Sequence, residues 1–378
     1  MTWGIKKVKM PYKQFDRKKL VLESLNARRN KQRIEFDHIP VDRKPSGQSA
    51  GAKKTITETI LKIKKARKNG RPVMLVFGAH TVKNGLSPVL IKLIEDGWVT
   101  HLATNGAGII HDWEFAYQGQ TSEHVEENVE RGRFGAWKET GFNINIAIIA
   151  GAYHGLGYGE SVGAFIENGG VDIPSREQLK KIICSNALSD PGKSAAAADL
   201  FETVKTFSLK PGRISVTHPF KKYSIQAAAY RLKVPFTGHP MIGHDIIYVH
   251  PVNSGAAIGR AALRDFLSFT NSVSALDGGV YLSVGSAVMS PMIFEKALSM
   301  SQNLAIQKGK HIDNHYIVVV DLAKSEWDWK KQGEPPMDNS AYYLRYCKTF
   351  SRMGGTMKYL SADNRDFLLS LYQGLSSR

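Results

Sequence analysis

The sequence predicts an α/β protein with a doubly wound, mostly parallel sheet and a basic N-terminal arm. From Arg71 onward, short β-branched runs alternate with longer segments of helical period, a pattern typical of a parallel sheet covered by helices. Two turns, residues 77–88 and 103–108, each follow such a run and are rich in Gly, Asn and hydroxyl side chains. Because small residues at strand ends let backbone N–H groups approach a phosphate, these turns favour a nucleotide site.

The positive charge is concentrated at the start of the chain. The formal net charge is +17, and residues 1–71 hold 21 Lys or Arg against 6 Asp or Glu. We therefore expect a basic arm over residues 1–50 and one large domain over residues 51–378. The segment Leu20–Arg33 has only a thin apolar stripe and no interleaved aromatic residues for base stacking. An acidic protein partner is thus a better fit for the arm than nucleic acid.

Composition limits the class of protein. The 378 residues are 42% hydrophobic and 22% charged, which is enough to bury a substantial core. No apolar stretch approaches the ~20 residues of a membrane span, and the N-terminus lacks the apolar segment of a secretory signal. We expect a cytoplasmic location and no membrane association. Cys184 and Cys347 fit no metal or redox spacing, so we interpret them as buried thiols.

The order of elements follows from apolar runs and helix boundary signals. Strands are expected at residues 73–77, 99–104, 213–217, 234–238, 279–284, 315–320 and, more weakly, 356–360. Ser87 is expected to cap a helix that has Pro88 at its first position and stops at Gly97. Further helices are expected at residues 254–276 and from Ser290 to about Asn303. Residues 123–170 should form closely packed helices, and residues 331–338 a lid-like loop.

Three motifs occur in a fixed order along most of the chain. They are Thr104-Asn-Gly-Ala-Gly-Ile-Ile-His-Asp112, His244-Asp-Ile-Ile-Tyr-Val-His250 and Val280-Tyr-Leu-Ser-Val-Gly-Ser286. In this order the chain resembles the deoxyhypusine synthase family, NAD-dependent enzymes that move an aminobutyl group from spermidine to a protein lysine. The resemblance implies a Rossmann-like fold, NAD as the cofactor, a polyamine as the amine donor and a homotetramer with sites between subunits.

The resemblance also implies site residues. Lys348 corresponds to the lysine that forms an imine with the butyl fragment, although it is not securely in register. Asp245 corresponds to an acid, while the family's acidic pair becomes Ile110-His111, which makes His111 a substitute base. The expected substrate-binding residues are Asp245, His250, Ser290 and Asp338. The expected NAD-binding residues are His80, Thr81, Asn84, Ser87, Thr104, Asn105, Gly106, Ala107, Gly108, Gly285, Ser286, Ala362 and Asp363.

Two other functions remain open from the residues alone. A metal-dependent hydrolase could use ligand-type side chains that fit no compact spacing: His111, Asp112, Glu114, His239, His244, Asp245 and His250. A non-catalytic nucleotide-binding protein could engage an acidic partner or nucleic acid through its basic arm. The plainest interpretation of the motif residues is structural: Thr104–Gly108 as a tight turn, Lys348 as a surface charge and His111 as the hydrogen-bond partner of a neighbouring acid.

Overall fold

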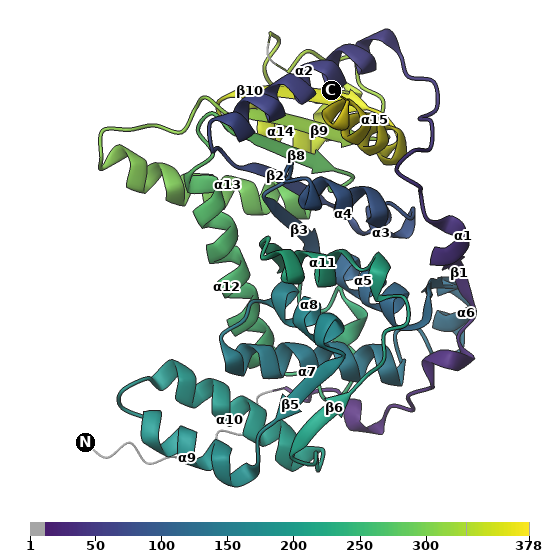
Figure 1. Cartoon of the computed structure of the whole chain (residues 1–378), viewed down its shortest axis with the longest axis vertical. Coiled ribbons are helices and arrows are strands. Elements are labelled where there is room, and N and C mark those ends of the chain that lie inside the picture. Colours follow the sequence, from purple (N-terminus) through teal and green to yellow (C-terminus); the bar gives the residue numbers. More distant parts are fainter. Residues whose placement is uncertain (1–11, 330, 378) are drawn as a thin grey trace.

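The computed structural model describes residues 12–329 and 331–377, and its centre is a six-stranded parallel sheet (Figure 1). The strands are β2 (Val73–Phe77), β3 (His101–Asn105), β7 (Phe236–His239), β8 (Val280–Val284), β9 (Tyr316–Asp321) and β10 (Thr356–Ser361). They lie in the order β10-β9-β8-β2-β3-β7. Numbered along the chain and read from β7, this order is 3-2-1-4-5-6, the order of dinucleotide-binding sheets. The predicted Rossmann-like, doubly wound fold is therefore confirmed.

Helices connect the strands, and two small antiparallel pairs lie outside the central sheet. These pairs are β1 (Asn30–Arg33) with β4 (Gln120–Glu123), and β5 (Gly170–Ile173) with β6 (Gly212–Ser215). The α-helices are α1 (Ile34–Asp37), α2 (Ala50–Lys68), α3 (Ala79–Lys83), α4 (Ser87–Glu95), α5 (Gly106–Gln118), α6 (Val125–Glu130), α7 (Lys138–His154), α8 (Tyr158–Asn168), α9 (Arg176–Asn186), α10 (Pro191–Thr206), α11 (Ile225–Leu232), α12 (Gly255–Ser274), α13 (Met289–Ile306), α14 (Arg345–Ser351) and α15 (Asn364–Ser376). The 3-10 helices are η1 (Arg17–Lys19), η2 (Leu25–Ala27), η3 (Lys221–Tyr223), η4 (Ile246–Tyr248) and η5 (Ser340–Tyr343).

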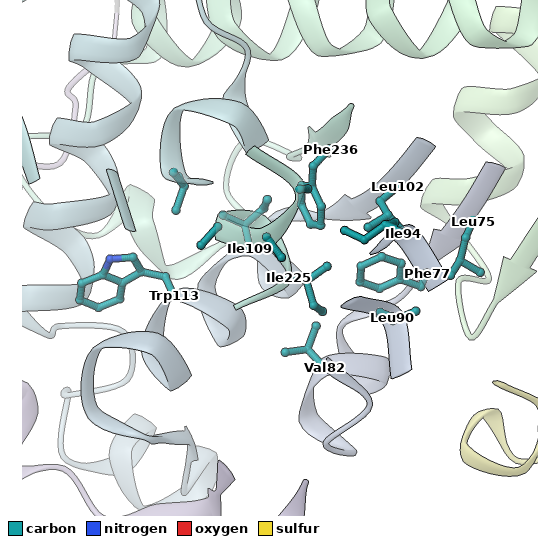
Figure 2. Close-up of a cluster of buried hydrophobic side chains, with 14 of the residues drawn as sticks. Leu75, Phe77, Val82, Leu90, Ile94, Leu102, Ile109, Trp113, Ile225 and Phe236 are labelled. Atoms are coloured by element: carbon teal, nitrogen blue, oxygen red, sulfur yellow. The ribbon is translucent and has the colours of Figure 1, made fainter. Parts of the chain in front are cut away.

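The two faces of the sheet carry separate apolar clusters. Alternate residues of a strand point to opposite faces, so Leu75 and Phe77 belong to one cluster while Met74 and Val76 belong to the other. Helices α2, α4, α11 and α15 supply the first cluster, part of which is drawn in Figure 2, and α12, α13 and α14 supply the second. All five residues of β2 are buried, as expected for a central parallel strand covered on both faces.

Residues 12–49, which we call the N-terminal strap, lie along the body of the protein. In Figure 1 this purple segment runs down one side of the molecule beside α6. Its anchors Leu25, Ile34 and Ile39 are buried. Residues 12–49 of the predicted basic arm are therefore packed against the rest of the protein. Residues 1–11 of that prediction lie outside the described residues.

Three local predictions were wrong. The run at residues 213–217 forms β6, which pairs with β5 in a small antiparallel sheet and is not a strand of the central sheet, because strand propensity does not specify a partner. Ser87 is the first residue of α4, and the cap position belongs to Leu86. Cys184 is exposed, whereas Cys347 is buried as predicted. Among the described helices, none combines the length and apolar character needed to span a membrane.

Candidate functional site

The sheet changes winding direction between β2 and β8, and two glycines meet there. Gly78 follows β2 and Gly285 follows β8, with Gly285 at a φ of +59°. A Cβ atom on Gly78 would lie 2.0 Å from the Gly285 carbonyl oxygen, so only glycine fits at position 78. In open α/β sheets, ligands bind in the crevice at the carboxyl ends of strands at this switch point. We call the carboxyl ends of β2 and β8, with the turns that follow them, the crevice, and this part of the sheet edge is therefore the leading candidate for a nucleotide site.

Segments that follow three different strands converge at this crevice. Asn84 Nδ2 donates a hydrogen bond to Asn364 Oδ1 at 3.0 Å, and Asn364 Nδ2 donates to Thr81 Oγ1 at 3.4 Å. The Asn364 amide also lies 3.9 Å from the Cβ position of Gly285. The predicted turns around Thr81 and Gly285 thus come together with the start of α15. Asn364, the residue directly after the predicted Ala362-Asp363 pair, was missed.

The turn after β3 is closed by its own side chains. Thr104 is fully buried and donates to the Phe77 carbonyl oxygen at 2.8 Å, which ties β3 to β2. Asn105 caps α5 by accepting a hydrogen bond from Gly108 N at 2.9 Å. A Cβ atom on Gly106 would lie 2.2 Å from Asp245 Oδ2. The side chains of this turn therefore serve the fold, and Ala107 is the member that lines a cavity.

The predicted serines differ in what they can reach. Ser87 is fully buried, and its hydroxyl has no hydrogen-bond partner among the described residues. Ser286 accepts a hydrogen bond from Ser290 N, and the Ser290 hydroxyl lies 3.0 Å from the Tyr281 hydroxyl. Both of these serines are buried, and Ser290 is the second residue of α13. His80 is exposed. The predicted contacts of these residues with cofactor or substrate stay predictions.

A polar cavity of about 200 Å³ adjoins the crevice on the β3 side. It lies between α5, β4 and the loop after β7, and its charged or titratable lining residues include Arg28, Lys83, His111, Glu114, Glu123 and Asp245. Ser122, also in the lining, has a φ of +70°, a backbone conformation that residues other than glycine rarely adopt. We call this cavity the acid–base pocket, and it holds two of the three predicted catalytic residues, His111 and Asp245.

Asp245 is an unusual carboxyl group. Burial raises its pKa to about 6, although a hydrogen bond from the Met241 backbone and the nearby His244 act in the opposite direction. Among the described residues, Asp245 Oδ2 has no hydrogen-bond partner, and the same holds for the buried hydroxyls of Tyr158 and Tyr248. A carboxyl group with this pKa can hold or release a proton near neutral pH, as general acids and bases must.

The third predicted catalytic residue, Lys348, lies elsewhere. Its Nζ forms an ion pair with Glu334 and sits 4.9 Å from the centre of the Tyr342 ring. It belongs to α14, which packs beside β10, whereas Asp245 follows β7 at the opposite edge of the sheet. With five strand-to-strand steps of about 4.8 Å, roughly 24 Å separates the two regions. One chain therefore does not bring Lys348 into contact with Asp245.

The remaining predicted substrate residues do not gather in the acid–base pocket. His250 is buried, and its Nδ1 accepts a hydrogen bond from Val252 N at 3.1 Å. Asp338 is exposed on the loop after β9. Neither residue lines the acid–base pocket. Their predicted contact with a substrate stays a prediction.

The cluster proposed for a metal does not assemble. Within residues 12–329 and 331–377, no three His, Cys, Asp or Glu side chains converge as a metal site would require. Asp112 accepts hydrogen bonds from Ser224 Oγ and the Ile225 backbone, and Glu114 pairs with Arg28. Asp112 and Glu114 are thus occupied by structural hydrogen bonds, so the geometry does not favour a hydrolytic metal centre.

His239, another member of that cluster, is buried and provides a test of the fold. Its Nε2 lies 3.0 Å from Thr237 Oγ1, and burial lowers its pKa to about 3. The unfolded chain takes up a proton near pH 6.5, whereas the folded chain does not until about pH 3. The stability linked to this group is therefore complete above pH 6.5 and is lost as the pH falls, by about 1.4 kcal/mol per pH unit.

His239→Gln should therefore flatten the fall in unfolding free energy between pH 6.5 and pH 4. Urea unfolding at several pH values measures this slope. His124→Gln is the matched control, because His124 is exposed. Equal slopes for the two variants would show that His239 takes up its proton as readily in the fold as in the unfolded chain.

Comparisons with known proteins give only remote similarities. No protein-family model and no curated protein matches the chain. Among solved structures, a conserved putative LOR/SDH protein from Methanococcus maripaludis S2 is 12% identical over 89% of this chain and 73% of that chain, with a TM-score of 0.42. A putative deoxyhypusine synthase from Entamoeba histolytica is 12% identical over 73% and 81%, with a TM-score of 0.34.

A second group of structural matches consists of much longer chains. AgrE in complex with ornithine and NAD+ is 13% identical over 87% of this chain, with a TM-score of 0.43. The cyanobacterial arginine dihydrolase ArgZ is 12% identical over 85%, with a TM-score of 0.40. This chain spans about a third of their length, 34% and 32%.

Proposed function

We propose that the chain is an NAD-dependent enzyme whose dinucleotide lies across the carboxyl edge of the central sheet. The observation that carries this proposal is the strand order 3-2-1-4-5-6, with Gly78 and Gly285 packed together at its switch point. A side chain at position 78 would collide with the Gly285 carbonyl oxygen, and in this fold the first turn at the switch point is where a pyrophosphate binds. The amides of Asn84 and Asn364 stand beside this place as neutral hydrogen-bond donors and acceptors.

The acid–base pocket fits the adenosine end of the dinucleotide. In this fold, an acidic residue about 20 residues beyond the first turn binds the adenosine ribose through its hydroxyls. No acid lies on β3 here. Asp245, which follows the adjacent strand β7 and lies against Gly106, would take that role with the oxygen that has no partner among the described residues. The nicotinamide would then lie toward β8 and β9, near the loop that leads to α14. NAD would supply a hydride acceptor, and the protein would orient it.

The resemblance to deoxyhypusine synthase suggests aminoalkyl transfer from a polyamine as the reaction. Lys348, on the β9–β10 side of the sheet, is the candidate nucleophile and must lose its ion pair with Glu334 to act. A homotetramer, as in that family, would let a second chain complete the site. Apolar side chains that are exposed on α12 and α13 support self-association: Leu263, Leu267, Met292, Met300 and Leu304.

Lys348→Ala should abolish transfer of the aminoalkyl group while leaving NAD affinity unchanged. Hydride transfer from the amine to NAD precedes the attack by the lysine, so the expected loss is confined to the later step that needs a nucleophile. Transfer of label from labelled spermidine to an amine acceptor measures the activity. Lys358→Ala, which removes a partly exposed lysine from β10, is the control. Full activity in Lys348→Ala would overturn the imine mechanism.

One observation favours a second candidate, a nucleotide-binding protein without catalysis. The Lys348 ammonium is held by Glu334, which also pairs with Arg352, so Lys348 is not free to act as a nucleophile in this conformation. Such a protein would bind NAD and form no NADH with any amine. The basic strap would then engage an acidic protein. Salt-sensitive retention of nucleic acid, lost on deletion of residues 1–50, would instead assign the strap to nucleic acid.

A further inference from the structure

The N-terminal strap contacts segments that follow three strands of the central sheet, β7, β2 and β10. Arg17 donates to the Tyr248 carbonyl oxygen at 2.7 Å in the loop after β7. Farther along, Ile39 N donates to the Gly85 carbonyl oxygen at 2.8 Å, and Gln48 Nε2 donates to the Asp366 carbonyl oxygen at 3.0 Å on α15. Between these contacts, Arg28 enters the acid–base pocket. The strap is therefore part of the candidate site and not only a cover for it.

Arg28 forms a buried, two-pronged ion pair with Glu114 of α5. Its Nη1 and Nη2 donate to Glu114 Oε1 and Oε2 at 2.8 Å and 2.6 Å, and both side chains are only 1% exposed. Burial alone would raise the pKa of Glu114, but the Arg28 guanidinium outweighs it and the pKa is lowered. Glu114 is consequently ionised at neutral pH.

An ionised Glu114 determines the direction of the hydrogen bonds beyond it. A carboxylate only accepts, so the Thr121 hydroxyl must donate to Glu114 Oε2, 2.5 Å away. The Thr121 oxygen is then left to accept from His111 Nδ1 at 2.7 Å. His111 lines the acid–base pocket, and with Nδ1 used in this way its Nε2 is the nitrogen available to a ligand.

The charges around His111 keep its ring neutral. Burial lowers its pKa to about 4, and only Glu114 favours protonation. Lys83 and His80 of α3 and Arg28 of the strap all disfavour a proton on the ring. A neutral imidazole with a hydrogen on Nδ1 carries its lone pair on Nε2.

We propose that Arg28 is a positioning residue for the candidate site: through Glu114 and Thr121 it fixes His111 as the Nδ1–H tautomer, which presents Nε2 to the pocket as a hydrogen-bond acceptor. A ligand group that donates a hydrogen bond, such as a hydroxyl or an amine N–H, is accepted there. The use of this acceptor for the dinucleotide or the amine rests on the proposed function. The tautomer itself is a property of the free protein.

Nitrogen-15 NMR of the full chain, labelled at histidine and without added ligand, tests the proposal. His111→Gln identifies the His111 signals. We expect a protonated Nδ1 and an unprotonated Nε2 in the wild type, and a loss of that preference in Thr121→Val, which leaves the Arg28–Glu114 pair in place. Thr121→Ser keeps the hydroxyl and should restore the wild-type signals. Arg28→Met should shift the same signals if it folds.

The outcomes separate this proposal from the proposed function. A hydrogen on Nε2 in the wild type, or unchanged His111 signals in Thr121→Val, would overturn the positioning role of Arg28. NAD titration of the same samples is a separate readout. Absence of NAD binding with the expected tautomer would leave the positioning role of Arg28 intact and reject only the nucleotide assignment. NAD binding with the hydrogen on His111 Nε2 would support the nucleotide assignment and reject the positioning role.

Discussion

Arg28→Met is expected to lower the free energy of unfolding by about 3–5 kcal/mol, because it leaves the Glu114 carboxylate buried without its counter-charge. Thr121 and Thr140 also donate to this carboxylate, but two hydroxyls do not replace a guanidinium at 2.6 Å. The same change detaches the strap from α5. Urea or guanidinium unfolding of the variant and the wild type measures the effect.

Arg29→Met is the matched control for this prediction. It removes the same charge from the next residue, whose side chain is exposed, and should change stability by no more than about 0.5 kcal/mol. Adding Glu114→Gln to Arg28→Met should recover part of the loss, since the unpaired charge is then gone. If Arg28→Met is no less stable than Arg29→Met, the buried pair does not hold the strap.

Gly78→Ala is expected to damage both the sheet and the crevice. Its new methyl group would lie 2.0 Å from the Gly285 carbonyl oxygen, a backbone atom that moves only with the end of β8. We expect a loss of roughly 3 kcal/mol in the free energy of unfolding from this overpacking. Because the same atoms form the switch point, the affinity for NAD should fall at least tenfold even at temperatures where the variant is folded.

Gly259→Ala provides the control for the glycine substitution. Gly259 lies in α12 with nothing within 4 Å of its Cβ position, so alanine should stabilise the helix by about 0.5–1 kcal/mol. NAD affinity should be unaffected. A Gly78→Ala protein with wild-type stability and affinity would show that the strand ends are farther apart than described here and that the crevice does not depend on glycine.

The sequence indicated the strands well and the contacts between distant segments poorly. Buried β-branched runs identify a parallel strand without reference to a partner, which is why β2, β8 and β9 were found. The run at residues 213–217 has the same local character, yet it pairs only with β5. Strand propensity measures fit to a pleated surface and does not say which surface.

The candidate site shows the same limit. Thr81, Asn84 and Gly285 were found because each lies in a small-residue turn after a strand. Asn364 was missed although it follows a predicted segment, since only its contact with Asn84 in the fold reveals its place.

Arg28 was counted as one charge among many in a basic segment. Its role depends on Glu114, which lies far along the chain and looked like a metal ligand. Widely spaced anchors such as Leu25, Ile34 and Ile39 give no periodic pattern, so the packed strap resembled a free arm.

Hydrogen exchange of the full chain, with and without saturating NAD+, tests most directly whether the crevice between β2 and β8 is a dinucleotide site. We expect NAD+ to slow amide exchange in the segments that follow the strands, residues 78–87, 285–290 and 362–366, with additional protection around Asp245. The small antiparallel sheet of β5 and β6 serves as an internal reference and should not change. Unchanged exchange at the carboxyl edge, or protection confined to another part of the chain, would contradict the proposed site.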